Sequence, residues 1–175
     1  MWQYSEAPII HGIGTDNGEI CLCHPIYEPR IVEVYSPTAK FSEKKELISL
    51  FREIDGTLLW KLALADEKGI TFRSPTPPLI KNGILYIVAR EPQGNVLLAF
   101  ATANGTLLWS YCSGETTLSM PFIKDNTLYI GSNDGYAHAL QADSGTFLWK
   151  TFVTTSFGIA MHASPMILEH TPKAM

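Results

Sequence analysis

The sequence contains few cysteines and few charged residues, and both shortages exclude classes of protein. Its three cysteines, Cys21, Cys23 and Cys112, are an odd and sparse set among 175 residues. Small secreted domains held by disulfides carry an even and dense set, so we expect buried or free thiols here. Charged residues make up 17% of the chain, and its 13 basic residues are scattered at a net charge of −4. Nucleic-acid binders gather basic residues on one face, so the sequence predicts no nucleic-acid partner.

Long hydrophobic runs are also missing. No apolar stretch approaches the ~18 residues that would suggest a membrane span, so we expect none. The first ten residues, MWQYSEAPII, have neither a basic region nor an apolar core of the kind that export signals carry. This start favours a cytoplasmic location, and an upstream extension of the reading frame into a signal peptide would reverse that expectation.

The chain does contain a repeated phrase, Gly-Thr-x-Leu-Trp. It occurs at Gly56–Trp60, Gly105–Trp109 and Gly145–Trp149, and the copies recur about every 40 to 50 residues, a period typical of repeat architectures. A second phrase shares the period: Pro78–Ala89 matches Pro121–Ser132, and the stretch from Ser164 begins a third copy. Two independent markers with one period predict a repeated structural unit.

Each unit has the pattern of four short strands joined by turns. Turn residues at Asn82-Gly83, Asp125-Asn126 and Asn133–Gly135 separate β-branched and aromatic stretches. Strands that are apolar on both sides are typical of sheets buried between neighbours. The pattern therefore predicts an all-β protein, a β-propeller of four-stranded antiparallel blades with about three and a half blades present. A β-sandwich is the alternative, but it has no reason to repeat the Trp phrase in register.

The whole chain, 1–175, is expected to be a single partial propeller with units at 3–60, 61–109 and 110–149, and with 150–175 starting a further blade. Its first 35 residues fit the repeat least well. Trp2 is a candidate docking residue of an earlier blade, and either Pro8 or Pro25 could open the first strand. A strand that begins at Glu19 fits Pro8 better. The stretch Gly14–Glu19 is interpreted as a hairpin turn and not as a calcium loop, because it lacks the alternating ligand spacing.

The repeated phrases resemble those of the pyrroloquinoline-quinone-like repeat propellers, a family that includes quinoprotein dehydrogenases and an outer-membrane assembly lipoprotein. The matching segments are Ala139–Trp149, Ala99–Trp109 and, more loosely, Leu50–Trp60. The resemblance implies that the tryptophans dock between adjacent blades, with a glycine four residues upstream of each. The implied docking residues are Trp60, Trp109, Trp149, Gly56, Gly105 and Gly145. The family's aspartate is replaced here by Arg52, Ala101 and Gln141.

The resemblance also implies what an enzyme of this family would need. Its dehydrogenases hold quinone and calcium near a pair of adjacent bonded cysteines, whereas Cys21 and Cys23 stand two residues apart. A zinc site in Cys21–His24 would need further ligands at suitable spacing, so buried thiols are favoured there. His138 is expected to be a blade-interface histidine. We therefore predict no catalytic residues, no metal and no cofactor.

A non-catalytic interaction or ligand-binding scaffold, part of a larger propeller, is the favoured function, and its expected partner is another protein or the rest of that propeller. A quinone-dependent dehydrogenase fragment and the sensor domain of a signalling protein are the alternatives. An open arc of blades would leave apolar faces in water. The chain is therefore expected to be a fragment of a longer propeller or half of a ring closed by self-association. A small ring in which the Trp2 strand pairs with the strand from Ser164 is the other possibility.

Overall fold

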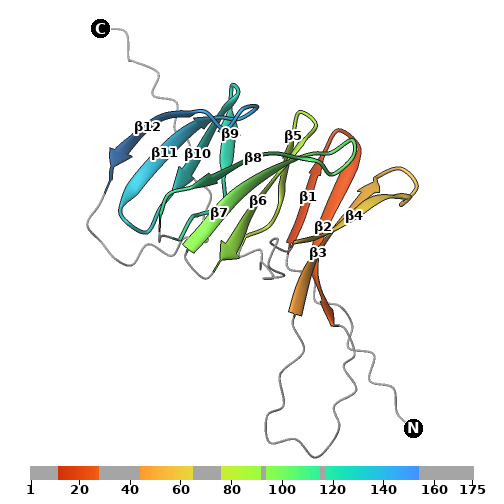
Figure 1. Cartoon of the computed structure of the whole chain (residues 1–175). Helices are drawn as coiled ribbons and strands as arrows, with labels where there is room; N and C mark the ends of the chain where they lie inside the picture. Colours follow the sequence, from red (N-terminus) through yellow and green to blue (C-terminus); the bar gives the residue numbers. More distant parts are fainter. Residues whose placement is uncertain (1–11, 28–43, 65–75, 92–93, 115–116, 154–175) are drawn as a thin grey trace, which may run out of the picture.

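The structure is a computed structural model that describes residues 12–27, 44–64, 76–91, 94–114 and 117–153. These residues form three four-stranded sheets, each with its strands in sequence order. Every neighbouring pair of strands within a sheet is antiparallel. The sheets stand in a row in the order of the sequence (Figure 1). The predicted fold, an all-β propeller of four-stranded antiparallel blades, is confirmed.

The first sheet consists of β1 (Gly12–Asp16), β2 (Glu19–Tyr27), β3 (Lys44–Arg52) and β4 (Leu58–Leu64). The second consists of β5 (Leu79–Lys81), β6 (Ile84–Glu91), β7 (Gly94–Ala101) and β8 (Leu107–Cys112). The third consists of β9 (Phe122–Lys124), β10 (Thr127–Gly131), β11 (Tyr136–Gln141) and β12 (Phe147–Phe152). We refer to them as blades 1, 2 and 3.

The first hairpin of each blade is closed by a two-residue turn with left-handed backbone. Both residues have positive φ in Asn17-Gly18, Asn82-Gly83 and Asp125-Asn126. Such turns match the right-handed twist of paired strands, and Asn, Asp and Gly adopt them most readily. The stretch Gly14–Glu19 is thus a hairpin turn, as expected. The strand that begins at Glu19 is the second of its blade and contains Pro25, so Pro25 does not open the first strand. The first described strand begins at Gly12, and both Pro8 and Trp2 lie outside the described residues.

Blade 2 is apolar on both faces because it is covered from both sides. Leu85, Ile87 and Ala89 of β6 pack with residues of blade 1 in one core. The alternate residues Tyr86 and Val88 pack with residues of blade 3 in a second core. Successive side chains of a strand point to opposite faces, so one strand contributes to two cores. The apolar character on both sides is therefore a consequence of stacking between blades.

The last strand of each blade contains a β-bulge that the sequence did not predict. The pairing register shifts between Leu50 and Phe51 in blade 1, and at the same place in blades 2 and 3. Two residues of the last strand then oppose one residue of its neighbour, which re-aims the side chain that follows. The extra residues are Leu59, Leu108 and Leu148, each directly before a tryptophan. The bulge explains why three apolar residues in a row break the alternation of an ordinary strand.

The first strands of blades 1 and 2, β1 and β5, lie close together. Gly14 of β1 lies against the main chain of Pro78, which precedes β5, with no space for a β-carbon. Near the same hairpins, Lys81 pairs with Asp16 at 3.6 Å, and the Asn82 amide donates to the same carboxylate at 3.1 Å. Blades 1 and 2 are thus joined at their first strands as well as through their shared core. Within the described ranges, no helix has the length and apolar character needed to cross a bilayer.

Candidate functional site

Trp60, on the last strand of blade 1, reaches the turn that precedes the last strand of blade 2. Its indole Nε1 donates a hydrogen bond to the Thr102 carbonyl at 2.6 Å. The ring lies over Gly105, where an added β-carbon would be 3.2 Å from the indole. Gly105 has a φ of 72°, a left-handed conformation that glycine adopts without penalty. The contact therefore uses a backbone carbonyl and a position without a side chain.

Trp109 makes the same contact one blade further along. Its Nε1 donates to the Ala142 carbonyl at 3.2 Å, and its ring lies so close to Gly145 that an added β-carbon would be 2.6 Å away. The Tyr86 hydroxyl donates to the same carbonyl at 3.1 Å. Burial raises the pKa of Tyr86, with a further contribution from Asp143, so this hydroxyl stays protonated as a donor. Two side chains of blade 2 thus converge on one carbonyl of blade 3.

The three turns that contain the repeat glycines share one hydrogen-bond pattern. The carbonyl of the first residue, Arg52, Ala101 or Gln141, accepts from the glycine amide four residues later at 2.8–2.9 Å. The resembled family has aspartate at these three positions. The same backbone hydrogen bond forms here whether the residue is arginine, alanine or glutamine. The departure from the family pattern therefore leaves the turn unchanged.

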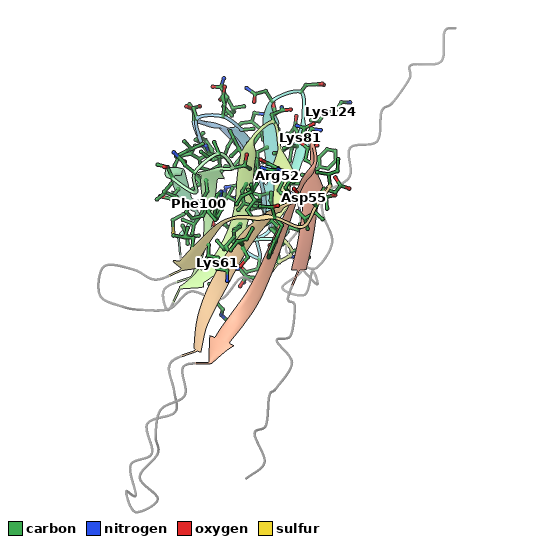
Figure 2. The ribbon with its side chains drawn as sticks, turned by 90° about the vertical axis from the view of Figure 1, so that its right-hand side faces the viewer. Arg52, Asp55, Lys61, Lys81, Phe100 and Lys124 are labelled. Carbon is green, nitrogen blue, oxygen red and sulfur yellow. The ribbon has the colours of Figure 1, made fainter. Side chains whose placement is uncertain are left out.

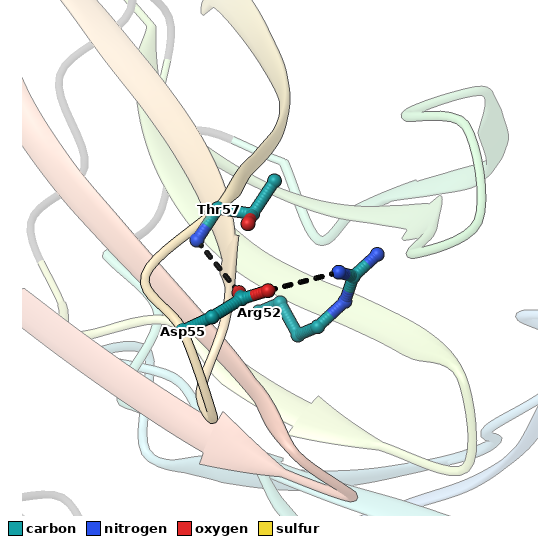
Figure 3. Close-up of polar contacts among 3 residues, drawn as sticks. All are labelled: Arg52, Asp55 and Thr57. Atoms are coloured by element: carbon teal, nitrogen blue, oxygen red, sulfur yellow. Dashed lines mark hydrogen bonds and ion pairs between the residues drawn. The ribbon is translucent and has the colours of Figure 1, made fainter.

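The turn of blade 1 is braced by its own ion pair (Figure 3). The Asp55 carboxylate accepts from the Thr57 amide at 2.9 Å and from Arg52 at 3.1 Å. The backbone hydrogen bond from Thr57 is the main cause that lowers the pKa of Asp55, and Arg52 lowers it further. Asn104 holds the Thr106 amide in the corresponding place at 3.0 Å. The residue before each glycine thus fixes the entry into the last strand.

The two outer ends of the row differ from the junctions between blades. Trp149 of blade 3 is 45% exposed and contacts the ring of Tyr129. At the other end, nothing described lies within 4 Å of a β-carbon added at Gly56. Of the six residues proposed for docking, four therefore meet in pairs, Trp60 with Gly105 and Trp109 with Gly145. Trp149 and Gly56 have no such counterpart among the described residues.

A second polar contact between blades 2 and 3 centres on His138, which is 3% exposed. The Tyr111 hydroxyl lies 2.7 Å from His138 Nδ1, and the Tyr111 ring stacks on Phe147 of blade 3. Burial lowers the pKa of His138, Lys150 lowers it further, and Asp134 partly opposes them. The imidazole is therefore held neutral at the interface. His138 lies between blades as expected, but its partner Tyr111 was not predicted.

Neither the described cysteines nor the described lysines gather at one place, and the side chains of Cys23 and His24 lie outside the described residues. Cys21 is buried in the core between blades 1 and 2, and Cys112 is exposed. Across the described ranges, no three His, Cys, Asp or Glu side chains come together in a way that could hold a metal ion. Figure 2 shows Lys81 and Lys124 toward one end of the molecule and Lys61 away from them. The described residues therefore form contacts between blades but no cluster of metal-ligating side chains.

Substitution of the repeat glycines by alanine should give a graded loss of stability. Gly56, Gly105 and Gly145 have nearly the same φ, 67°, 72° and 68°, so the backbone strain is similar, about 1 kcal/mol. A β-carbon meets nothing described at Gly56, the indole at 3.2 Å at Gly105 and the indole at 2.6 Å at Gly145. We expect Gly145→Ala to lose about 1–3 kcal/mol more than Gly56→Ala, with Gly105→Ala between them. Urea unfolding of dilute protein measures this order, and three equal losses would contradict the docking contact.

Removal of the tryptophans should distinguish an inner junction from an outer end. Trp109→Ala leaves a void between two blades and should reduce the free energy of unfolding by roughly 3–5 kcal/mol. Trp149→Ala removes a ring that is 45% exposed and should cost about 1 kcal/mol in dilute protein, where only the single chain contributes. Urea unfolding at low concentration compares the two. Equal losses would show that Trp109 is not buried between blades.

The lowered pKa of His138 should make stability depend on pH. The unfolded histidine has a pKa of about 6.5 and takes up a proton before the folded one does. The free energy of unfolding should therefore be fully retained above pH ~6.5 and should fall as the pH drops from there towards the folded pKa. His138→Gln, which can still form a hydrogen bond with Tyr111, should remove that part of the slope, since the other histidines titrate in both proteins. Parallel curves from urea unfolding across this range would contradict the assignment.

Comparison with known proteins identifies relatives of the whole arrangement. The family model described as Outer membrane protein assembly factor BamB matches residues 43–169. The curated protein of that name from Burkholderia pseudomallei is 32% identical over 111 residues, which are 60% of this chain and 27% of that protein. Tetrathionate hydrolase of Acidithiobacillus ferrooxidans is 36% identical over 59 residues, 34% of this chain and 12% of that protein.

Among solved structures, BamB from Moraxella catarrhalis has a TM-score of 0.57 at 21% identity, covering 86% of this chain and 39% of that one. This likeness supports the fold. The chain spans less than half the length of each of these three proteins. The family model, in contrast, covers well over half of the chain and includes all three repeats of the Trp phrase. The chain therefore belongs to the family of outer membrane protein assembly factor BamB, propellers built from the pyrroloquinoline-quinone-like repeat.

Proposed function

We propose that the chain is a non-catalytic scaffold that binds an extended segment of an outer-membrane protein during its assembly. Membership of the family supports the process, because its relatives are named as outer membrane protein assembly factors. The chain itself supports the mode of binding through the outer strand of each blade. No enzymatic step is part of the proposal.

The observation that carries the proposal is a pair of exposed apolar residues repeated on β4, β8 and β12. Each of these strands is the last in its sheet and pairs on one side only within the described blades. The six side chains are between 38% and 50% exposed, although large apolar residues usually lie inside. They are Leu58, Leu59, Leu107, Leu108, Phe147 and Leu148.

An edge strand with apolar side chains is suited to an extended apolar polypeptide. Its open backbone groups can pair with an added strand, and its side chains supply neighbouring apolar contacts. The strands of outer-membrane β-barrels alternate apolar and polar residues, and their backbone is unpaired before the barrel closes. Such a segment is therefore complementary to the outer strands in both backbone and side chains. Three equivalent edges in one rigid row would bind several segments of one client.

This function places the chain outside the cytoplasm, where outer-membrane proteins are assembled. The first residues of the sequence favoured the opposite location. The alternative of a quinone-dependent dehydrogenase gains no specific support from the described residues, and the segment similar to tetrathionate hydrolase covers 12% of that enzyme. Absorbance after addition of quinone and calcium, together with dye-linked alcohol oxidation, would detect a dehydrogenase directly.

Binding of an unfolded client tests the proposal. A fluorescently labelled outer-membrane β-barrel protein is diluted from urea into the purified chain, and binding is followed by fluorescence anisotropy. We expect the unmodified chain to bind and the double variant Leu107→Ser, Leu108→Ser to bind about tenfold more weakly, because it loses one apolar edge. Both residues are half exposed, so the fold should be retained, and far-ultraviolet circular dichroism checks this.

Ile54→Ser is the matched control. Ile54 is 89% exposed but lies in the turn between β3 and β4, outside the edge strands. The control removes an apolar side chain of similar size and, at concentrations where the chain is monomeric, should leave client binding unchanged. Absence of binding by the unmodified chain, or equal loss in both variants, would rule out recognition through the outer strands.

A further inference from the structure

Blade 3 carries an aromatic pair, Tyr129 and Trp149, with nearly the same geometry as the pair at the junction between blades 2 and 3. The rings of Tyr129 and Trp149 have centroids 6.0 Å apart and an interplanar angle of 54°. The rings of Tyr86 and Trp109 have centroids 5.9 Å apart and the same angle. The second pair donates two hydrogen bonds to the Ala142 carbonyl of the next blade. Trp149 with Tyr129 is thus arranged as a donor pair for one carbonyl of a further blade.

Blade 1 has the turn that such a pair would meet. The Glu53 amide donates to the Gly18 carbonyl at 2.7 Å, as the Thr102 and Ala142 amides do to the carbonyls of their own hairpins at 3.0 and 2.8 Å. The Glu53 carbonyl therefore stands at the position of the two acceptors that receive Trp60 and Trp109. This turn presents the same acceptor geometry as the two inner ones.

No described indole covers this turn, unlike the equivalent turns of blades 2 and 3. Gly56 takes a φ of 67° with no described atom within 4 Å of an added β-carbon, whereas Gly105 and Gly145 are each covered by an indole. Beside it, Ile54 is 89% exposed, more than any other large apolar side chain described. The equivalent residues of blades 2 and 3 are Ala103 and Asp143. The turn thus presents an apolar side chain beside a glycine that no described atom covers.

We propose that blade 3 of one copy docks on blade 1 of a second copy through Trp149 and Tyr129 on one side and the turn Arg52–Thr57 on the other. Trp149 lies over Gly56 of the second copy and donates to its Glu53 carbonyl. The same contact forms at the other end of the pair, so two copies close a ring with two equivalent junctions. The partner of this surface is a second copy of the chain.

Three properties of the described blades favour this occupant. The junction joins unlike ends, and such head-to-tail contacts either close into a ring or extend without limit. Closed propellers contain about four to eight blades, and two copies with three described blades each fall within that range. The chain also uses the same junction twice internally, so no new type of interface is required.

Sedimentation velocity of the full chain over a wide range of concentrations tests the proposal. The unmodified chain should form a discrete dimer. Trp149→Ala removes the donor ring, and Gly56→Ala places a β-carbon where the indole would lie, so each variant alone should dimerise more weakly by at least about tenfold. Gly114→Ala is the control, because Gly114 also has a positive φ of 98° with nothing described within 4 Å but follows β8 of blade 2, outside both proposed surfaces. It should dimerise like the unmodified chain.

Mixing the two weakened variants gives the sharpest result. The Trp149→Ala copy keeps an intact acceptor turn, and the Gly56→Ala copy keeps an intact donor ring, so a mixed pair retains one complete junction. The mixture should therefore dimerise more strongly than either variant alone. The proposal is overturned by a monomer at all concentrations, by growth beyond the dimer, by a dimer insensitive to Trp149→Ala, or by a mixture no stronger than its components. Circular dichroism confirms that each variant is folded.

Discussion

The arrangement of the three blades depends on one contact, an indole that lies over a glycine and donates to the backbone carbonyl three residues before that glycine. A tryptophan ring buries a large apolar area while its N–H requires a partner, and the turn supplies both an open surface and an acceptor. Trp60 uses Thr102 and Gly105 in this way, and Trp109 uses Ala142 and Gly145. Because donor and acceptor lie on opposite faces of each blade, the contact can be repeated along the row. It also gives the row two unlike ends.

The bulge before each tryptophan connects this contact to the outer surface. The register shift beside Leu59, Leu108 and Leu148 directs the following tryptophan towards the next blade. The same shift leaves the two residues before the tryptophan on the exposed edge of the sheet. One short phrase therefore serves two purposes, since it joins the blades and lines their outer strands with apolar side chains. The interaction function that we propose follows from the second purpose, and the pairing of two copies from the first.

Much of the fold could be predicted because the repeat consists of recurring residue types that can be recognised in the sequence. The spacing of the Trp phrase indicated the blades, Asn82-Gly83 indicated a hairpin, and the apolar character of β6 on both sides indicated stacking. The acceptor at Thr102 or Ala142 could not be predicted, since a main-chain carbonyl is the same for every residue. The bulge was missed because its evidence, Leu-Leu-Trp, also fits a strand buried on both faces. The pairing of Tyr111 with His138 joins two blades across a distance in sequence that no local pattern encodes.

A double-mutant cycle between Trp109 and Gly145 tests the central contact most directly. The free energy of unfolding is measured for the unmodified chain, Gly145→Ala, Trp109→Ala and the double variant in urea, under conditions where the chain is monomeric. If the indole lies over the glycine, the steric part of the Gly145→Ala loss disappears once the ring is gone, and only the strain of the left-handed backbone remains. The predicted result is therefore a coupling of about 1 kcal/mol or more. Losses that add without coupling would contradict the account, because they would show that the ring and the glycine do not meet.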